Sequence, residues 1–133
     1  MEIIIVVTII SLLAAIAIPN LLRARISANE TAAISALKAL SSAAVTYRSS
    51  HSEYPVNLSA LIAESPPYID SVLAGGTKQG YTFNFTGSSY SFEAAAAPVT
   101  FGRTGRRYFF VDDSGVLRYN ESEAATVSSL PLE

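Results

Sequence analysis

The sequence predicts an α+β protein in which one long N-terminal helix is followed by a small antiparallel sheet. Residues 3–18 are aliphatic and uncharged, and apolar side chains then recur at helical spacing to about Ser50. From Tyr81 onward, aromatic and polar side chains alternate in short runs. Clusters of glycine, serine and aspartate separate these runs, which is typical of strands joined by tight turns.

The apolar run at the start of the chain is compatible with a bilayer. As a helix, residues 3–18 would span about 24 Å, slightly less than a hydrocarbon core of roughly 30 Å. A cleaved secretory signal peptide would need a basic segment before the run and small residues after it. Here the only charge before the run is acidic Glu2, and the run is followed by Pro19 and then by Arg23, without a small-residue cleavage site. A membrane anchor fits better but leaves Glu2 unexplained, because a carboxylate beside an apolar helix is costly without a partner.

The helix is expected to continue beyond this run with a single apolar face. Side chains at 4,3,4,3 spacing define that face: Ala33, Leu37, Leu40, Ala44 and Tyr47. Residues 1 to about 50 should therefore form one helix of roughly 75 Å. Pro19 removes a backbone donor and crowds the preceding turn, so it predicts a kink in the helix rather than a loop. We interpret residues 1–25 as an apolar stalk and residues 26–133 as a globular head.

The rest of the head should contain one short helix and four strands. Asn57 is a suitable N-cap for a helix over Leu58 to Glu64. The expected strands cover residues 81–85, 90–97, 107–111 and 116–120. Turns within residues 86–89 and 112–115 join them into two hairpins. The tail, residues 121–133, has no strong periodicity and is expected to be irregular.

Composition argues against an enzyme. The chain has 133 residues, a net charge of −2 and no cysteine, which excludes disulfides, thiolate metal sites and a cysteine nucleophile. So small a charge gives no electrostatic case for nucleic acid as the main partner. The single histidine, His51, lies in a serine-rich segment, and no sequence feature pairs it with a carboxylate, so we expect an exposed loop residue rather than a catalytic base. Neither a phosphate-binding loop nor a metal-ligand spacing occurs, and no cofactor is expected.

Residues 1–25, MEIIIVVTIISLLAAIAIPNLLRAR, resemble the N-terminus of the type IV pilin superfamily. That family carries one glutamate near its mature N-terminus, then an aliphatic run, an Ala-Ala-Ile-Ala-Ile-Pro-Asn box and basic residues. The box here is residues 14–20, and Glu2 and Pro19 are seventeen residues apart, as in the family. In the family several residues precede the glutamate, usually starting with an N-methylated phenylalanine exposed by removal of a leader, whereas here Met1 alone precedes it. Ser11 stands where family members often have glycine.

The resemblance implies a pilin fold, with the long kinked helix packed on a four-stranded antiparallel sheet. It also implies a precursor in the inner membrane, a prepilin peptidase and an assembly platform. Identical subunits would then form an extracellular helical filament, a pilus for adhesion, motility or DNA uptake, with Glu2 and Pro19 as assembly residues. The major pseudopilin of a type II secretion system is an alternative. A monomeric membrane-tethered binding domain is an alternative of another class.

Asp112 and Asp113 are the candidates for a metal site. Carboxylate oxygens are calcium ligands, and major secretion pseudopilins bind calcium in a C-terminal loop. No convincing copy of that loop is present here, and Asp-Asp-Ser-Gly is also an ordinary hairpin turn, which we favour.

Arg103, Arg106 and Arg107 form a basic cluster in the head. Because type IV pili often touch DNA or anionic surfaces, the cluster is a candidate surface patch for such contacts. Salt bridges to acidic residues of neighbouring subunits are the simpler interpretation.

Overall fold

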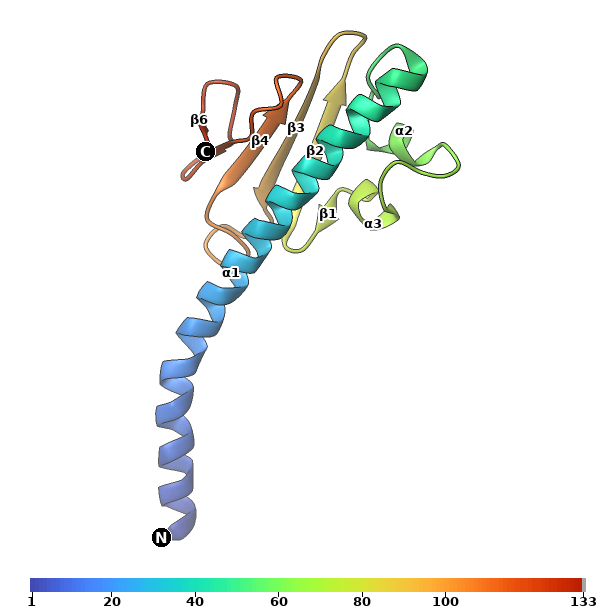
Figure 1. Ribbon diagram of the computed structural model, residues 1–133. Coiled ribbons are helices and arrows are strands. Elements are labelled where there is room, and N and C mark those ends of the chain that lie inside the picture. The colour runs from blue at the N-terminus through green and yellow to red at the C-terminus, as the bar shows by residue number, and fades with distance from the viewer. Residues whose placement is uncertain (133) are drawn as a thin grey trace.

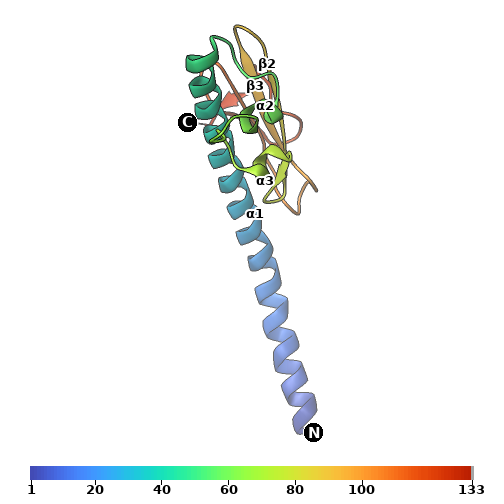
Figure 2. The same cartoon turned by 90° about the vertical axis from the view of Figure 1, so that its right-hand side faces the viewer.

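The computed structural model describes residues 1–132, and its longest element is the helix α1, Glu2–His51. The first half of α1 projects away from the rest of the chain, and the second half lies across one face of a sheet (Figures 1 and 2). The expected α+β class and the single long N-terminal helix are therefore confirmed. Ile26 is the first buried residue along the chain, so the projecting part corresponds to the stalk, residues 1–25.

Pro19 lies inside α1 without interrupting it. The helix is continuous from Glu2 to His51, as expected for a kink rather than a loop. Figure 1 shows α1 bending between the projecting stalk and the half that is packed on the sheet. A proline within a helix favours such a bend, because its ring crowds the preceding turn and its nitrogen cannot donate a hydrogen bond.

The hydrophobic core lies between α1 and the sheet. The buried apolar residues of α1 are mostly small: Ile26, Ala33, Ala36, Leu37, Leu40, Ala43 and Ala44. Alanines let the helix backbone come close to the sheet, where the largest fully buried side chains are aromatic: Tyr81, Phe92 and Phe109. Burial of this surface stabilises the head by about 25 cal/mol per Å² of apolar area.

The sheet has six strands, so the expectation of four was wrong. The strands are β1 (Thr77–Lys78), β2 (Tyr81–Gly87), β3 (Phe92–Pro98), β4 (Tyr108–Asp112), β5 (Arg118–Asn120) and β6 (Leu130–Pro131). They follow each other in chain order, and every neighbouring pair is antiparallel. The four expected strands correspond to β2 to β5. The two additional strands lie at the edges and have two residues each, too few to show an alternation in the sequence.

Strand boundaries differ from the expected ones by a few residues: β2 and β4 extend to Gly87 and Asp112, into the expected turns, β4 begins at Tyr108 rather than at residue 107, and β5 begins at Arg118 rather than at residue 116. β3 begins at Phe92 rather than Tyr90, because Ser88 and Ser91 close a turn in which the Ser88 N–H donates to the Ser91 carbonyl oxygen at 2.8 Å. This turn leaves Tyr90 at the tip of the hairpin, 83% exposed. The tail was expected to be irregular, but it contains β6, which pairs with β5 and places Pro131 at the sheet edge, where proline is tolerated.

Two short helices connect α1 to the sheet. α2, Leu58–Ile62, is capped as expected by Asn57, whose side-chain oxygen accepts from the Ala60 N–H at 3.1 Å. It ends two residues before the expected Glu64. α3, Ser71–Ala74, was not expected, since a single turn leaves no periodicity to detect; Asp70 caps it in the same way.

Candidate functional site

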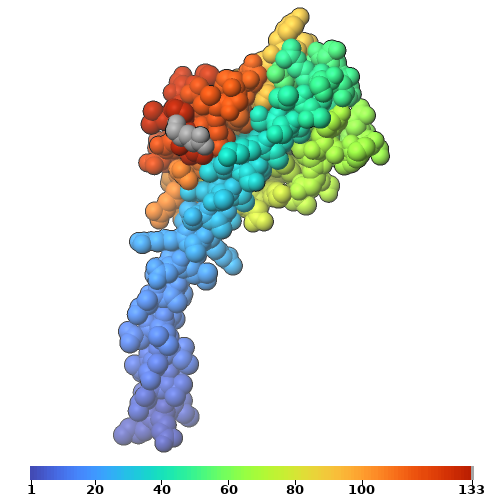
Figure 3. All heavy atoms as spheres, viewed as in Figure 1, coloured from blue at the N-terminus to red at the C-terminus, as the bar shows by residue number. Residues whose placement is uncertain are grey.

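The stalk presents an apolar surface with no cover. Large apolar residues between Met1 and Leu22 are 40% to 97% exposed, and Figure 3 shows the stalk projecting beyond the head. Within residues 1–132, α1 is the one helix long and apolar enough to cross a membrane. A helix that is apolar on all sides is stable only in lipid or among other helices. The stalk is therefore the first candidate for a functional surface.

Two hydroxyl groups lie within the apolar run of the stalk without interrupting its apolar surface. Thr8 Oγ1 donates to the Ile4 carbonyl oxygen at 2.7 Å, and Ser11 Oγ donates to the Val7 carbonyl oxygen at 2.8 Å. Both hydroxyls are thereby satisfied by the helix itself. Glu2 differs, because within residues 1–132 its carboxylate forms no ion pair. Pro19 is exposed in the same part of α1.

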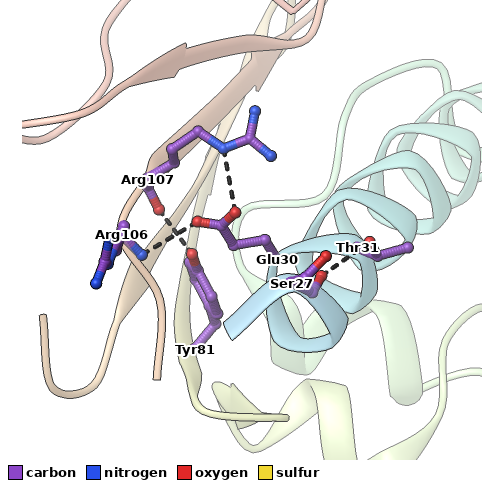
Figure 4. A network of polar contacts seen from close by, with 6 residues as sticks. All are labelled: Ser27, Glu30, Thr31, Tyr81, Arg106 and Arg107. Atoms are coloured by element: carbon purple, nitrogen blue, oxygen red, sulfur yellow. Dashed lines mark hydrogen bonds and ion pairs between the residues drawn. The ribbon is translucent and has the colours of Figure 1, made fainter. Parts of the chain in front are cut away.

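The base of the head contains a buried carboxylate, Glu30, which is only 8% exposed (Figure 4). Glu30 Oε1 accepts from Arg107 Nε at 3.2 Å, and Glu30 Oε2 accepts from the backbone N–H of Arg106 at 3.1 Å. The ion pair joins α1 to the segment that leads into β4. Two hydrogen bonds to the charged form compensate for the burial of this carboxylate.

Tyr81 completes this contact from the sheet side. Its hydroxyl donates to the Arg107 carbonyl oxygen at 2.8 Å. Burial, and secondarily the charge of Glu30, raises the pKa of the Tyr81 phenol, so the hydroxyl stays a donor at physiological pH. A Cβ at Gly105 would clash with the Tyr81 hydroxyl oxygen, so only glycine allows this approach.

A second hydrogen bond holds the same segment to the helix. Asn29 Nδ2 donates to the Thr104 carbonyl oxygen at 3.0 Å. Residues 99–107, which we call the base loop, are therefore attached to consecutive residues of α1, one turn after the stalk ends. The base loop thus helps to set how the stalk leaves the head.

The structure divides the basic cluster. Arg107 is bound within the molecule to Glu30, whereas Arg103 and Arg106 are exposed. The sequence pattern did not reveal a role for Glu30 in this contact. A signal was present, because positions 26, 30, 33, 37, 40 and 44 continue the same helical spacing and place this glutamate on the buried face.

The two calcium candidates, Asp112 and Asp113, lie at the turn that follows β4. Asp112 is buried, and its side chain accepts from the Ser114 N–H at 3.0 Å and from the Ser114 hydroxyl, while Asp113 is exposed. Within residues 1–132, no three His, Cys, Asp or Glu side chains gather where they could hold a metal ion. Asp112 therefore acts as a hairpin-turn residue in this structure.

His51 is the last residue of α1 rather than part of a loop, and it does have a carboxylate partner. Its Nε2 lies 3.0 Å from Glu64 Oε1, and its ring stacks on Tyr47 with centroids 3.9 Å apart. His51 is exposed, as predicted, but its carboxylate partner could not be inferred from the sequence, where no feature pairs the two residues. The partner is thirteen residues away in sequence and reaches His51 only after the chain turns back through α2.

Comparison of the chain with protein-family models and with curated proteins found no match.

Proposed function

We propose that this chain is a structural subunit of a helical filament of the type IV pilin class, assembled through its stalk. The observation that carries the proposal is an uncovered apolar helix that leaves a compactly packed head and has one carboxylate, Glu2, at its start. The resemblance of residues 1–25 to pilin N-termini supports it. The stalk holds the precursor in the inner membrane and later packs among the stalks of neighbouring copies.

Apolar burial supplies the driving force for this assembly. Stalks packed against each other keep their apolar surface out of water once they have left the membrane, and this is worth about 25 cal/mol per Å² of apolar area relative to exposure to water. The same two unlike surfaces meet at every step along the filament, and such contacts form an open helix when the rotation between successive copies does not close into a ring. The heads then form the outer wall of an extracellular pilus.

Glu2 gives this packing its register. A carboxylate among packed apolar helices costs several kcal/mol unless a cation meets it. The resemblance to pilins points to an N-terminal amine as that cation, from the same subunit or a neighbour. A subunit then docks stably only where its carboxylate reaches the amine.

The test replaces Glu2 by valine in the complete chain. We expect Glu2→Val to accumulate normally in the membrane fraction but to yield few sheared surface filaments, because an apolar stalk still inserts but has lost its register contact. Thr8→Val is the matched control, since it removes a stalk polar group that is satisfied within its own helix. Normal filament yield from Glu2→Val would refute the proposed assembly mechanism.

The location of the filament distinguishes a pilus from a type II secretion pseudopilus. A pilus appears by negative-stain microscopy in material sheared from the cell surface, whereas a type II secretion pseudopilus stays within the envelope. If the wild-type chain forms no filament in either place, the monomeric membrane-tethered domain replaces the proposal.

A further inference from the structure

The head has two distinct ends along α1. At the end that we call the upper end, α1 finishes near the β2–β3 hairpin, where Ser89 Oγ donates to Glu53 Oε2 at 3.4 Å. At the lower end, the stalk enters and the base loop contacts Glu30. Figure 1 shows these ends at opposite extremes of the head. Any parallel stack of copies brings the lower end of one copy toward the upper end of another.

The upper end is acidic. Its carboxylates are Glu53, Glu64, Glu93, Asp112 and Asp113. Glu93 lies opposite Asp112 in the β3–β4 register, and Asp113 follows in the turn. Both Glu93 and Asp113 are exposed, and neither forms an ion pair within residues 1–132.

Cations at the upper end are already engaged. Arg48 lies over the Tyr54 ring, 4.9 Å from its centroid, and His51 contacts Glu64. The exposed carboxylates therefore outnumber the cations that are free to neutralise them.

The lower end carries the opposite charge. Exposed arginines surround the place where the stalk enters the head: Arg23, Arg25, Arg103 and Arg106. Within residues 1–132 none of these four forms an ion pair. Glu121 and Glu123 lie near the same end, after β5, and they reduce the positive charge without cancelling it.

The lower end also has a hollow, and the upper end has a projecting side chain. The lower end contains a hollow of about 390 Å³ whose lining combines apolar, aromatic and basic side chains: Ile26, Glu30, Phe101, Arg106, Arg107 and Glu121. The upper end contributes a projecting aromatic residue, Tyr90, which is 83% exposed at the tip of the β2–β3 hairpin. Interfaces characteristically combine an aromatic anchor in a pocket with arginines.

We propose that in the filament the upper end of one copy docks on the lower end of another, with Tyr90 in the hollow and with Glu93 and Asp113 facing Arg103 and Arg106. This inference rests on the proposed filament and names the contact between its heads. Charge complementarity fixes the occupant as a second copy of this chain, because every copy carries both surfaces. The contact adds orientation to the less directional packing of the stalks.

Charge reversal in the complete chain tests the proposal. Arg103→Glu should lower the ratio of sheared filament to membrane-held subunit about fivefold, because like charges then face each other. Lys38→Glu makes the same change in net charge at an exposed position between the two ends and should leave the ratio near that of the wild type. Adding Asp113→Lys to Arg103→Glu should restore most of the yield.

The aromatic anchor has its own test. Tyr90→Ser should lower filament yield, whereas Tyr90→Phe should preserve it, because the ring and not the hydroxyl fills the hollow. Tyr90 is exposed, so neither change removes a core contact of the head.

Several results would overturn this inference. If wild-type filaments form and Arg103→Glu behaves like Lys38→Glu, or if Asp113→Lys deepens the defect, the proposed head contact is wrong while the filament stands. If Arg103→Glu leaves yield unchanged but lowers the retention of DNA by purified filaments, the lower end is a DNA-binding surface. If the wild-type chain forms no filament, the proposed function fails and this contact fails with it.

Discussion

Glu30 carries the main polar contact between the long helix and the sheet. Replacing it by alanine leaves the Arg107 guanidinium and the Arg106 N–H without their acceptor, so Glu30→Ala should lower the free energy of unfolding by about 3 kcal/mol. Urea unfolding of the full chain in detergent micelles, followed by circular dichroism, measures this change. Glu123→Ala removes an exposed carboxylate and should change stability little. Equal effects of both substitutions would show that the Glu30 contacts contribute nothing specific.

His51 reports on a second contact, between the end of α1 and the segment after α2. Its Nδ1 lies 3.0 Å from the Tyr47 carbonyl oxygen, and its Nε2 faces Glu64, so the protonated ring donates to both acceptors. The Tyr47 carbonyl, and then Glu64, raise the pKa of His51 above 6.5. Because the folded-state pKa is raised, the stabilisation is complete below about pH 6.5 and is lost as the pH rises through the folded-state value.

The single histidine makes this shift directly measurable. An NMR titration of the His51 ring in the full chain should give a pKa above 6.5, and Glu64→Gln should bring it closer to 6.5. Glu53→Gln is the control, since Glu53 acts on His51 only through its more distant charge and should change the pKa less. A wild-type pKa at or below 6.5 would contradict the hydrogen bonds to both ring nitrogens.

At the scale of elements, the sequence was informative wherever a pattern repeated. The 4,3,4,3 spacing of α1 and the alternation in β2 and β3 have enough residues to define a buried face. β1, β6 and α3 have two to four residues each, and tertiary neighbours determine them. The same limit applies to the site, since the stalk was recognisable as a continuous run, whereas the Glu30–Arg107 pair joins residues 77 positions apart.

The stalk helix should change when it is packed in a filament. In the single chain α1 is continuous, but Pro19 already lacks one hydrogen bond. Neighbouring stalks can cover the carbonyl groups freed by local unwinding, so we expect the helix to be broken or stretched between Ala14 and Pro19. A filament map at side-chain resolution checks this. Unbroken helical hydrogen bonding between these residues, apart from the donor that proline lacks, would refute the prediction. Ser11, whose hydroxyl donates to the Val7 carbonyl oxygen, lies in the helix before this segment.

At the scale of the whole molecule, the stalk and the head have separate sources of stability. Every buried residue lies between Ile26 and Ala125, and within residues 1–132 the stalk contributes none to the core. The contacts that anchor α1 to the sheet begin at Asn29 and Glu30, inside the head. Removal of the stalk therefore removes apolar surface that is exposed and leaves the packed core intact.

A fragment of residues 26–133 should accordingly be soluble without detergent, monomeric, and folded with mixed helix and strand content. The physical reason is that the half of α1 within it keeps its sheet-facing side chains, while the surface that drives association is gone. Circular dichroism and sedimentation measure fold and mass, and the full chain, which should aggregate or require detergent under the same conditions, is the control. A spectrum of a disordered chain would show that the head needs the stalk to fold. A folded fragment that still polymerised would move the main assembly surface from the stalk to the head.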